Sequence, residues 1–341
     1  MKMTMAGTGA MSARRRRLNP QRAAVAIVAL LLVIYPFWVG DYQISVARDA
    51  LIFGILALSL DFLWGKAGIL SFGQAAFFGI GAYAVAILGP RIGGGDAFLF
   101  GLAAGLAVAA LVAGAVGYFL LYGGVRGPYL TIVTLALSLV AERIATGWAE
   151  VTGGDAGLLG SPPPGLELPG FILRLGEPLS QYFLVIVLLA ASVYGILRWC
   201  NGRRGMVLAA LQGNELKLRA LGYDTAGRLL SVFIASSMIA ALAGSLYAGV
   251  SGFVAPDLVG LLLSTRTIVW VAVGGRGTLF GPILGAFFVT RLQTEISSIS
   301  YALWPLIMGV FFVALVFVFP EGLLPFLLRQ LTSLFGREAR T

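Results

Sequence analysis

Long apolar segments recur along this chain and constrain its fold more than any other feature of the sequence. A hydrocarbon core needs about 20 apolar residues for each helical crossing. Ten segments are candidates for such crossings: 23–39, 46–64, 67–89, 97–122, 128–148, 179–198, 229–250, 264–274, 281–298 and 302–319. The segment 264–274 is short enough for a half-helix. Because only 11% of the residues are charged, too few to cover a water-facing surface, the sequence predicts an all-α polytopic membrane protein with some broken helices.

The positive charges are distributed as in a membrane protein with both ends on one side. Most Lys and Arg residues fall in the segments 1–22 and 199–228, in short connections between other spans, and in the tail 325–341. Cytoplasmic segments carry such an excess, so we expect cytoplasmic termini and a membrane domain over 23–324. The same pattern accounts for the net charge of +9 without a nucleic-acid partner.

The first span follows four consecutive arginines, Arg14 to Arg17, and so resembles a signal peptide. No small-x-small cleavage site follows Pro36, Phe37 and Trp38. This favours a retained membrane anchor, with a cleaved signal as the alternative.

The residue inventory argues against catalysis. The chain has no histidine, and its one cysteine, Cys200, can form neither an internal disulfide nor a thiolate metal site. Ser-His-Asp chemistry and zincin motifs are therefore excluded. The chain also lacks the G-x-x-x-x-G-K-[ST] loop that cradles nucleotide phosphates. We expect a protein that is not an enzyme and binds no cofactor, so that any ATP and Mg²⁺ would be held by partner chains.

Two glycine-rich segments interrupt the apolar pattern, one in each half of the chain. The first runs from Gly65 to Gly81 and includes Ser71 and Gln74; the second runs from Gly274 to Gly285. Broken helices at membrane depth are tolerated beside a cavity or inside protein, and paired breaks mark binding sites in transporters built from repeats. The alternative is close packing of helices by small residues, with Gln74 bonding between helices.

Charged residues near the ends of spans receive a structural interpretation. Glu142 and Arg143 near one end of the fifth span, and Arg48 and Asp49 in the second, lie where snorkelling relieves the cost of a charge. The segment from Gly205 to Asp224 mixes apolar and charged residues. We expect it to form short helices at the membrane surface, which either dock into a groove of a partner or rest on lipid headgroups.

Several of these segments together resemble the LivM/LivH permeases of branched-chain amino acid ABC importers, a family that also includes urea and short-amide permeases. The resemblance is carried by Asp61–Tyr83, Gly124–Leu137, Thr152–Gly157, Gly202–Gly222, Ala240–Gly249, Trp270–Ala286 and Phe319–Leu323, in family order. No single piece would suffice, and the set covers about residues 48 to 324.

The resemblance implies a mechanism and partners. Two permease subunits, here expected to be a heterodimer with a sister permease, would form the pathway in a bacterial plasma membrane. Two cytoplasmic ATPases would drive it, and an external solute-binding protein would deliver the solute.

The resemblance also implies which residues take part. The ATPase-coupling residues would be Gly205, Ala210, Glu215, Arg219, Ala220 and Gly222, within the segment 199–228. Lys217 and Arg219 depart from the small or acidic residues that are usual there, which implies a more acidic partner surface. The translocation pathway would include Ser71, Gln74, Tyr83, Tyr129, Thr131, Thr134, Gly274, Gly275 and Gly277.

The solute implied by the resemblance is a branched-chain or other hydrophobic amino acid, with urea or short amides as the alternative. A rival of a different class is an ion-coupled secondary transporter. That rival predicts acidic residues in mid-span, whereas Asp and Glu here lie almost entirely at the ends of spans.

Overall fold

The computed structural model describes residues 32–168, 171–299, 309–310, 322 and 324–325. The expected N-terminal segment 1–22, the span 302–319, most of the span 23–39 and the tail beyond residue 325 lie outside the described residues. Only the end of the first span is described, and it includes a short 3₁₀ turn, η1 (Tyr35–Phe37).

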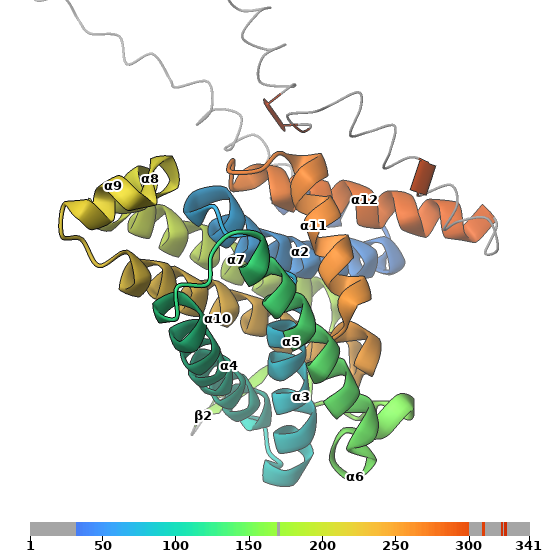
Figure 1. The fold of residues 1–341 in the computed structure, drawn as a ribbon. Helices are drawn as coiled ribbons and strands as arrows, with labels where there is room; N and C mark the ends of the chain where they lie inside the picture. The colour runs from blue at the N-terminus through green and yellow to red at the C-terminus, as the bar shows by residue number, and fades with distance from the viewer. Residues whose placement is uncertain (1–31, 169–170, 300–308, 311–321, 323, 326–341) are drawn as a thin grey trace, which may run out of the picture.

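Helices dominate the described chain, as Figure 1 shows. The longer ones are α2 (Asp41–Asp61), α3 (Gln74–Ile92), α4 (Ala97–Tyr122), α5 (Pro128–Gly147), α7 (Pro178–Cys200), α10 (Thr225–Ser251), α11 (Leu261–Gly274) and α12 (Phe280–Ile299). Of these described helices, α3, α4, α5, α7 and α10 are long and apolar enough to cross a membrane, and α11 is a shorter apolar helix. The prediction of an all-α polytopic membrane protein is confirmed.

Shorter elements connect these helices. They are the π-helical turn η2 (Phe62–Lys66), α6 (Ala149–Thr152), η3 (Gly154–Ala156), α8 (Arg203–Gly213), α9 (Glu215–Ala220) and η4 (Pro256–Leu258).

The largest departure from the predicted spans lies between the second and third. A span was expected to start at residue 67, but α3 begins only at Gln74, and residues 68–73 are not helical. Gly68 adopts a left-handed conformation (φ 77°), and its N–H bonds to the carbonyl of Trp64 at 3.1 Å. A glycine in this conformation ends a helix at little steric cost.

The core is centred on α2, which packs against α7, α10, α11 and α12. A second group of contacts joins α3, α4 and α10, where glycines let backbones approach closely. A Cβ on Gly244 would lie 1.8 Å from the carbonyl oxygen of Phe78, and one on Gly81 would lie 2.0 Å from that of Ala241. Small residues therefore set the spacing of these helices, as is typical in membranes.

Two small β pairs organise the loops at the end of the molecule opposite α8 and α9. β1 (Leu158–Leu159) pairs with β4 (Phe253–Val254), and β2 (Gly165–Leu168) pairs with β3 (Phe171–Arg174), both antiparallel. The sequence did not suggest them. The β1–β4 pair ties the α6–α7 connection to the α10–α11 connection.

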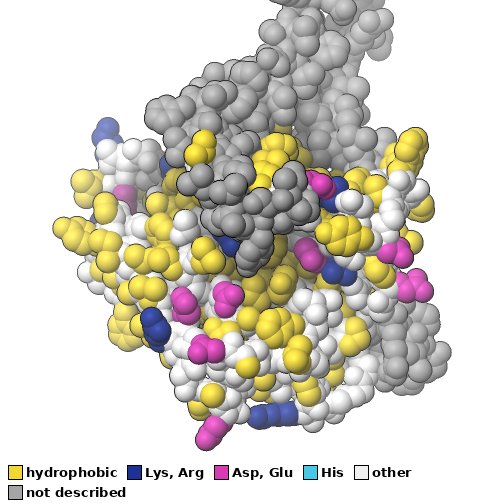
Figure 2. All heavy atoms as spheres, turned by 90° about the vertical axis from the view of Figure 1, so that its right-hand side faces the viewer, with side chains coloured by type: hydrophobic (Ala, Val, Ile, Leu, Met, Phe, Trp, Pro, Cys, Tyr) yellow, Lys and Arg dark blue, Asp and Glu magenta, His cyan; other side chains and the backbone are white. Residues whose placement is uncertain are grey.

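Much of the outer surface is apolar. Large side chains such as Leu111, Phe119 and Val187 are exposed, and Figure 2 shows a face on which charged groups are scattered among hydrophobic ones. Such a surface suits lipid or neighbouring helices rather than water.

Candidate translocation pathway and coupling surface

The break at residues 68–73 has its backbone hydrogen bonds completed by side chains of α5. Thr131 Oγ1 donates to the carbonyl of Leu70 at 3.0 Å, and Thr134 Oγ1 accepts from the N–H of Phe72 at 3.2 Å. Backbone groups in a non-helical segment at membrane depth need such partners because no water is available there. Thr131 and Thr134, both expected in the pathway, thus lie on α5 and form hydrogen bonds to this break.

Two serines complete the same arrangement. The carbonyl of Phe72 accepts from Ser138 Oγ of α5 at 2.6 Å and also from Ser264 Oγ of α11. Ser71 Oγ accepts from the N–H of Gly73 at 3.1 Å, so this expected pathway residue supports the turn itself. Ser138 follows Thr134 by four residues on one face of α5, a spacing that could have revealed it from the sequence.

Gln74, at the start of α3, is buried in a network that joins three helices. Its Nε2 donates to Ser236 Oγ of α10 at 3.0 Å, and its Oε1 accepts from Ser59 Oγ of α2 at 3.2 Å. Ser236 Oγ in turn donates to the carbonyl of Ser59 at 2.7 Å. The amide therefore bonds between helices, and 1% of the residue is exposed.

The second break, residues 275–279, is held by a buried acid that the sequence did not reveal. Asp61, at the end of α2, accepts from the N–H of Gly277 at 2.5 Å and from that of Leu279 at 3.1 Å. Lys66 Nζ donates to the carbonyl of Gly277 at 2.7 Å. Leu279 has a positive φ of 62°, a conformation that a non-glycine residue keeps only when its surroundings fix it.

The π-turn η2 and the second break lie against each other. A Cβ on Gly65 would come within 2.6 Å of Gly277 Cα. Arg276 stacks over the Trp64 ring at 4.8 Å and donates to the Trp64 carbonyl at 3.2 Å. Gly274 is buried, and a Cβ there would lie 1.9 Å from the carbonyl of Gly281. Gly274 and Gly277 therefore each take part in a close backbone contact, Gly274 with Gly281 and Gly277 with Gly65, and Gly275 lies between them in the chain.

Tyr83 lies elsewhere, on α3. It is 8% exposed, and its hydroxyl has no hydrogen-bond partner in the described structure. The carboxylate of Asp257, in η4, is within electrostatic range of Tyr83, of Tyr247 on α10 and of Arg266 on α11. Asp257 and Arg266 form no direct ion pair with each other. Asp257 thus stands near both a buried hydroxyl that has no described partner and the guanidinium of Arg266.

An aromatic cluster borders this group. Phe53 of α2 lies 5.7 Å from Tyr247 and 5.1 Å from Trp270, measured between ring centroids. Tyr129, the remaining expected pathway residue, is 73% exposed at the start of α5 and is not part of this cluster.

The segment α8–α9 forms a ridge at one end of the molecule (Figure 1). Leu208, Leu211 and Leu218 are buried against the body, whereas Met206, Leu216 and Leu221 are exposed. We call the exposed side of residues 203–223 the coupling ridge. Of the residues expected to couple to an ATPase, Ala210, Arg219, Ala220 and Gly222 are exposed on it.

Two of the expected coupling residues face the body instead. Glu215 Oε1 accepts from Arg126 Nε at 2.8 Å and from Thr225 Oγ1 at 3.2 Å, so its carboxylate anchors α9 to the neighbouring connections. A Cβ on Gly205 would lie 1.8 Å from the carbonyl oxygen of Cys200, so the tight turn from α7 into α8 requires glycine at this position.

The coupling ridge is bonded directly to η2, the turn that precedes the first break. Gln212 Nε2, on α8, donates to the carbonyl of Gly65 in η2 at 3.2 Å. Gly65 packs on Gly277, so three segments far apart in the sequence form one continuous contact. This connection was not predicted, since neither partner has a distinctive local pattern.

Comparison with known proteins gives a consistent result. The family model described as "Branched-chain amino acid transport system / permease component" matches residues 42–319. The high-affinity branched-chain amino acid transport system permease protein LivM of Escherichia coli K12 is 29% identical over 335 residues, covering 91% of this chain and 76% of that protein. LivM of Salmonella typhimurium is 29% identical over 93% of this chain and 78% of its own length.

A relative of lower identity is named for another solute. The autoinducer 2 import system permease protein LsrC of Enterobacter sp. strain 638 is 27% identical over 85% of this chain and 82% of that protein. No solved structure matches the chain. With helices fit to span a membrane and a family model that covers most of its length, the chain belongs to the family of branched-chain amino acid transport permease components.

Proposed function

We propose that this chain is a translocating subunit of an ATP-driven importer that moves branched-chain or other hydrophobic amino acids into the cytoplasm. The observation that carries the proposal is the contact from the coupling ridge through Gln212 and Gly65 to Gly277. Through this contact, a partner that displaces the ridge would also displace η2, which precedes the first break, and Gly277 in the second break.

The proposed mechanism is alternating access. ATP-driven closure of two partner ATPases would displace α8, and the displacement would reach η2 and the 275–279 break through these contacts. Broken helices are suited to such a shift because their backbone bonds to side chains can exchange more readily than a helical ladder. One arrangement is favoured with ATP bound and the other after release.

The coupling ridge fits an acidic groove on the ATPase. Its exposed apolar centre, with Met206 and Leu221, is flanked by exposed Lys217 and Arg219. An amphipathic helix of this kind docks by its apolar residues and orients by its charges. ATP and Mg²⁺ would be bound by these partner chains.

The remaining assembly follows from the same proposal. A sister permease would complete the pathway as a heterodimer, and an external binding protein would deliver the solute. The chain would lie in a bacterial plasma membrane with both termini in the cytoplasm.

The amino-acid assignment is supported by Asp257, which lies in electrostatic range of both Tyr83 and Arg266. A zwitterionic solute presents an ammonium group and a carboxylate, which Asp257 and Arg266 could each receive, because neither is consumed by a direct pair with the other. The Tyr83 hydroxyl would add a hydrogen bond, and Phe53 and Trp270 offer an apolar wall for the side chain. Urea carries neither charge nor an apolar side chain.

Uptake of labelled leucine and labelled urea, in cells with and without this gene, tests the assignment. Loss of leucine uptake alone, abolished also by an ATPase-dead partner, is expected. Loss of urea uptake alone would overturn the amino-acid assignment. If neither changes, autoinducer 2 is the next solute to measure because of the LsrC relatives.

A further inference from the structure

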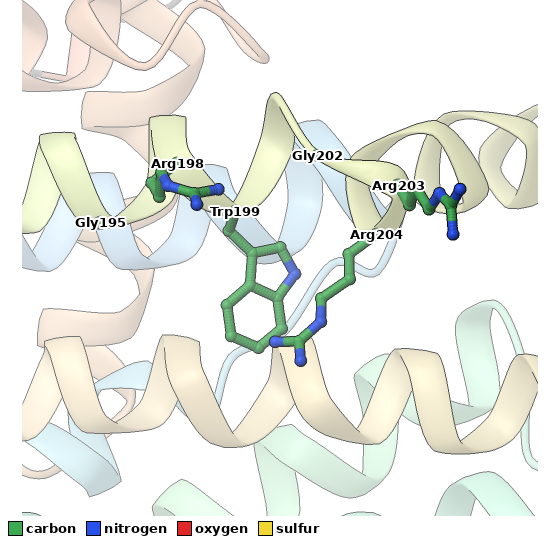
Figure 3. A pocket seen from close by; sticks show the side chains of 6 residues that line it. All are labelled: Gly195, Arg198, Trp199, Gly202, Arg203 and Arg204. Atoms are coloured by element: carbon green, nitrogen blue, oxygen red, sulfur yellow. The ribbon is translucent and has the colours of Figure 1, made fainter.

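A hollow of about 490 Å³ lies where α7 turns into α8 (Figure 3). It is lined by Gly195, Arg198, Trp199, Gly202, Arg203 and Arg204. The Arg204 guanidinium stacks on the Trp199 ring at 5.2 Å, which holds this cation beside the hollow. No acidic side chain lines it.

None of the three arginines takes part in the ion pairs found among the described residues, which include Arg48–Asp49 and Arg126–Glu215. The first turn of α8 adds to the positive field. Its N-cap, Gly202, supplies no side-chain acceptor for the first backbone N–H groups. A helix N-terminus attracts anions, and here it borders the hollow that the three arginines line.

An apolar strip on α7 leads away from this hollow. Val187, Ala191, Tyr194 and Arg198 are all exposed and follow one another at intervals of three or four residues, so they share one face of the helix. Val187 is 63% and Tyr194 70% exposed. A ligand that fits both parts must have an anionic head and a long apolar body.

We infer that the hollow binds the phosphate headgroup of an anionic phospholipid, with the acyl chains lying along the exposed face of α7. In the proposed orientation this is the cytoplasmic leaflet, where anionic lipids meet basic residues. The lipid would sit at the hinge between a membrane helix and the coupling ridge. Trp199 also contacts Phe62 edge-on at 6.2 Å, so the site borders η2 as well.

The test is native mass spectrometry of the purified full chain in detergent, titrated with phosphatidylglycerol and, separately, with phosphatidylcholine of the same acyl chains. The wild-type protein should prefer phosphatidylglycerol. The variant Arg198→Gln/Arg204→Gln should lose about thirtyfold in affinity for that lipid, because each cation near a headgroup contributes a factor of about 5.4 and the two factors multiply.

The matched control is Arg219→Gln/Arg228→Gln, which removes two exposed arginines of the same region away from the hollow. It should keep the preference, and Arg198→Lys/Arg204→Lys should keep most of it, because the charges remain. Equal binding of both lipids by the wild type, or equal loss in the control, would overturn the inference. Displacement of the lipid by inorganic phosphate at millimolar concentration would also overturn it, by indicating a site for a soluble anion. Because lipid binding is measured without transport, the outcome is independent of the solute.

Discussion

Single residues in this protein mostly act by completing the backbone of a neighbouring segment. Asp61 is the clearest case, because its carboxylate accepts two N–H groups of the 275–279 break and is fully buried. Glu215 likewise has a structural role, because its carboxylate accepts a hydrogen bond from the Arg126 side chain and so anchors α9. Charges that a sequence presents as candidates for function are here used first to hold irregular segments in place.

We predict that Asp61→Asn destabilises the protein by about 2–4 kcal/mol, since hydrogen bonds to a charged group contribute about 1.5–3 kcal/mol each and the new amide N–H₂ faces donors. The measurement is thermal unfolding of the purified chain in detergent. Asp155→Asn, at an exposed position of the η3 turn, is the control and should leave the midpoint unchanged. Equal midpoints for both variants would show that the Asp61 contacts are not stabilising.

Glycine contacts between helices allow a second test at this scale. Gly244→Ala should prevent the α3–α10 contact, because the new Cβ would lie 1.8 Å from a carbonyl oxygen, and overpacking of this kind costs at least about 1–3 kcal/mol. Gly114→Ala, on α4, meets its nearest atom at 3.8 Å and should be neutral or slightly stabilising. The test compares the yield and melting temperature of the two purified variants, and both should be lower for Gly244→Ala than for Gly114→Ala.

Elements in this fold are joined by a few hydroxyl and amide bonds, and the helix break at 68–73 shows what the sequence could and could not predict. The helix α4 was predicted at its observed bounds because its apolar run is long and ends in glycine. The glycine-rich segment Gly65–Gly81 was expected to interrupt a helix, and residues 68–73 are not helical. The span was nevertheless drawn from residue 67, because Ile69, Leu70 and Phe72 are as apolar as helix residues. Its partner Ser138 shares a face of α5 with the expected pathway residue Thr134, but Ser264 on α11 is distant in sequence, and no local pattern identifies it.

Removing the Thr134 hydroxyl, which bonds to the same break, should weaken the junction between α5 and the segment that leads into α3. Thr134→Val keeps the shape of the side chain but leaves the Phe72 N–H without its acceptor, which costs about 1–3 kcal/mol when the group is buried. Thr146→Val in the same helix breaks only a bond to its own turn at an exposed position. The difference between the two unfolding midpoints measures how much the hydrogen bond from Phe72 N–H to Thr134 contributes to stability. Equal midpoints would contradict the prediction.

The contact between the coupling ridge and η2 predicts an uncoupled variant. Gln212→Ala should lower leucine transported per ATP several-fold, with ATPase binding retained, because the bond to the Gly65 carbonyl is lost while the exposed ridge keeps its shape. Asn201→Ala, an exposed amide between α7 and α8, should leave the ratio unchanged. An unchanged ratio in the Gln212 variant would mean that motion reaches the breaks by another route.

The whole molecule combines a helix bundle spaced by glycines, two helix breaks and the coupling ridge. The second break packs against η2, which precedes the first break. The family and the all-α architecture followed from the sequence because hydropathy and ordered motifs extend over most of the chain. The links between these parts did not, since they join residues such as Asp61 and Gly277, more than two hundred positions apart. These links join segments that the sequence presents separately.

The most direct test of this account is leucine accumulation in proteoliposomes that contain the chain, its sister permease and both ATPases. The account predicts that accumulation requires ATP and binding protein, and that no imposed proton or sodium gradient replaces them. Accumulation driven by an ion gradient in the absence of ATP would contradict the account and favour a secondary transporter.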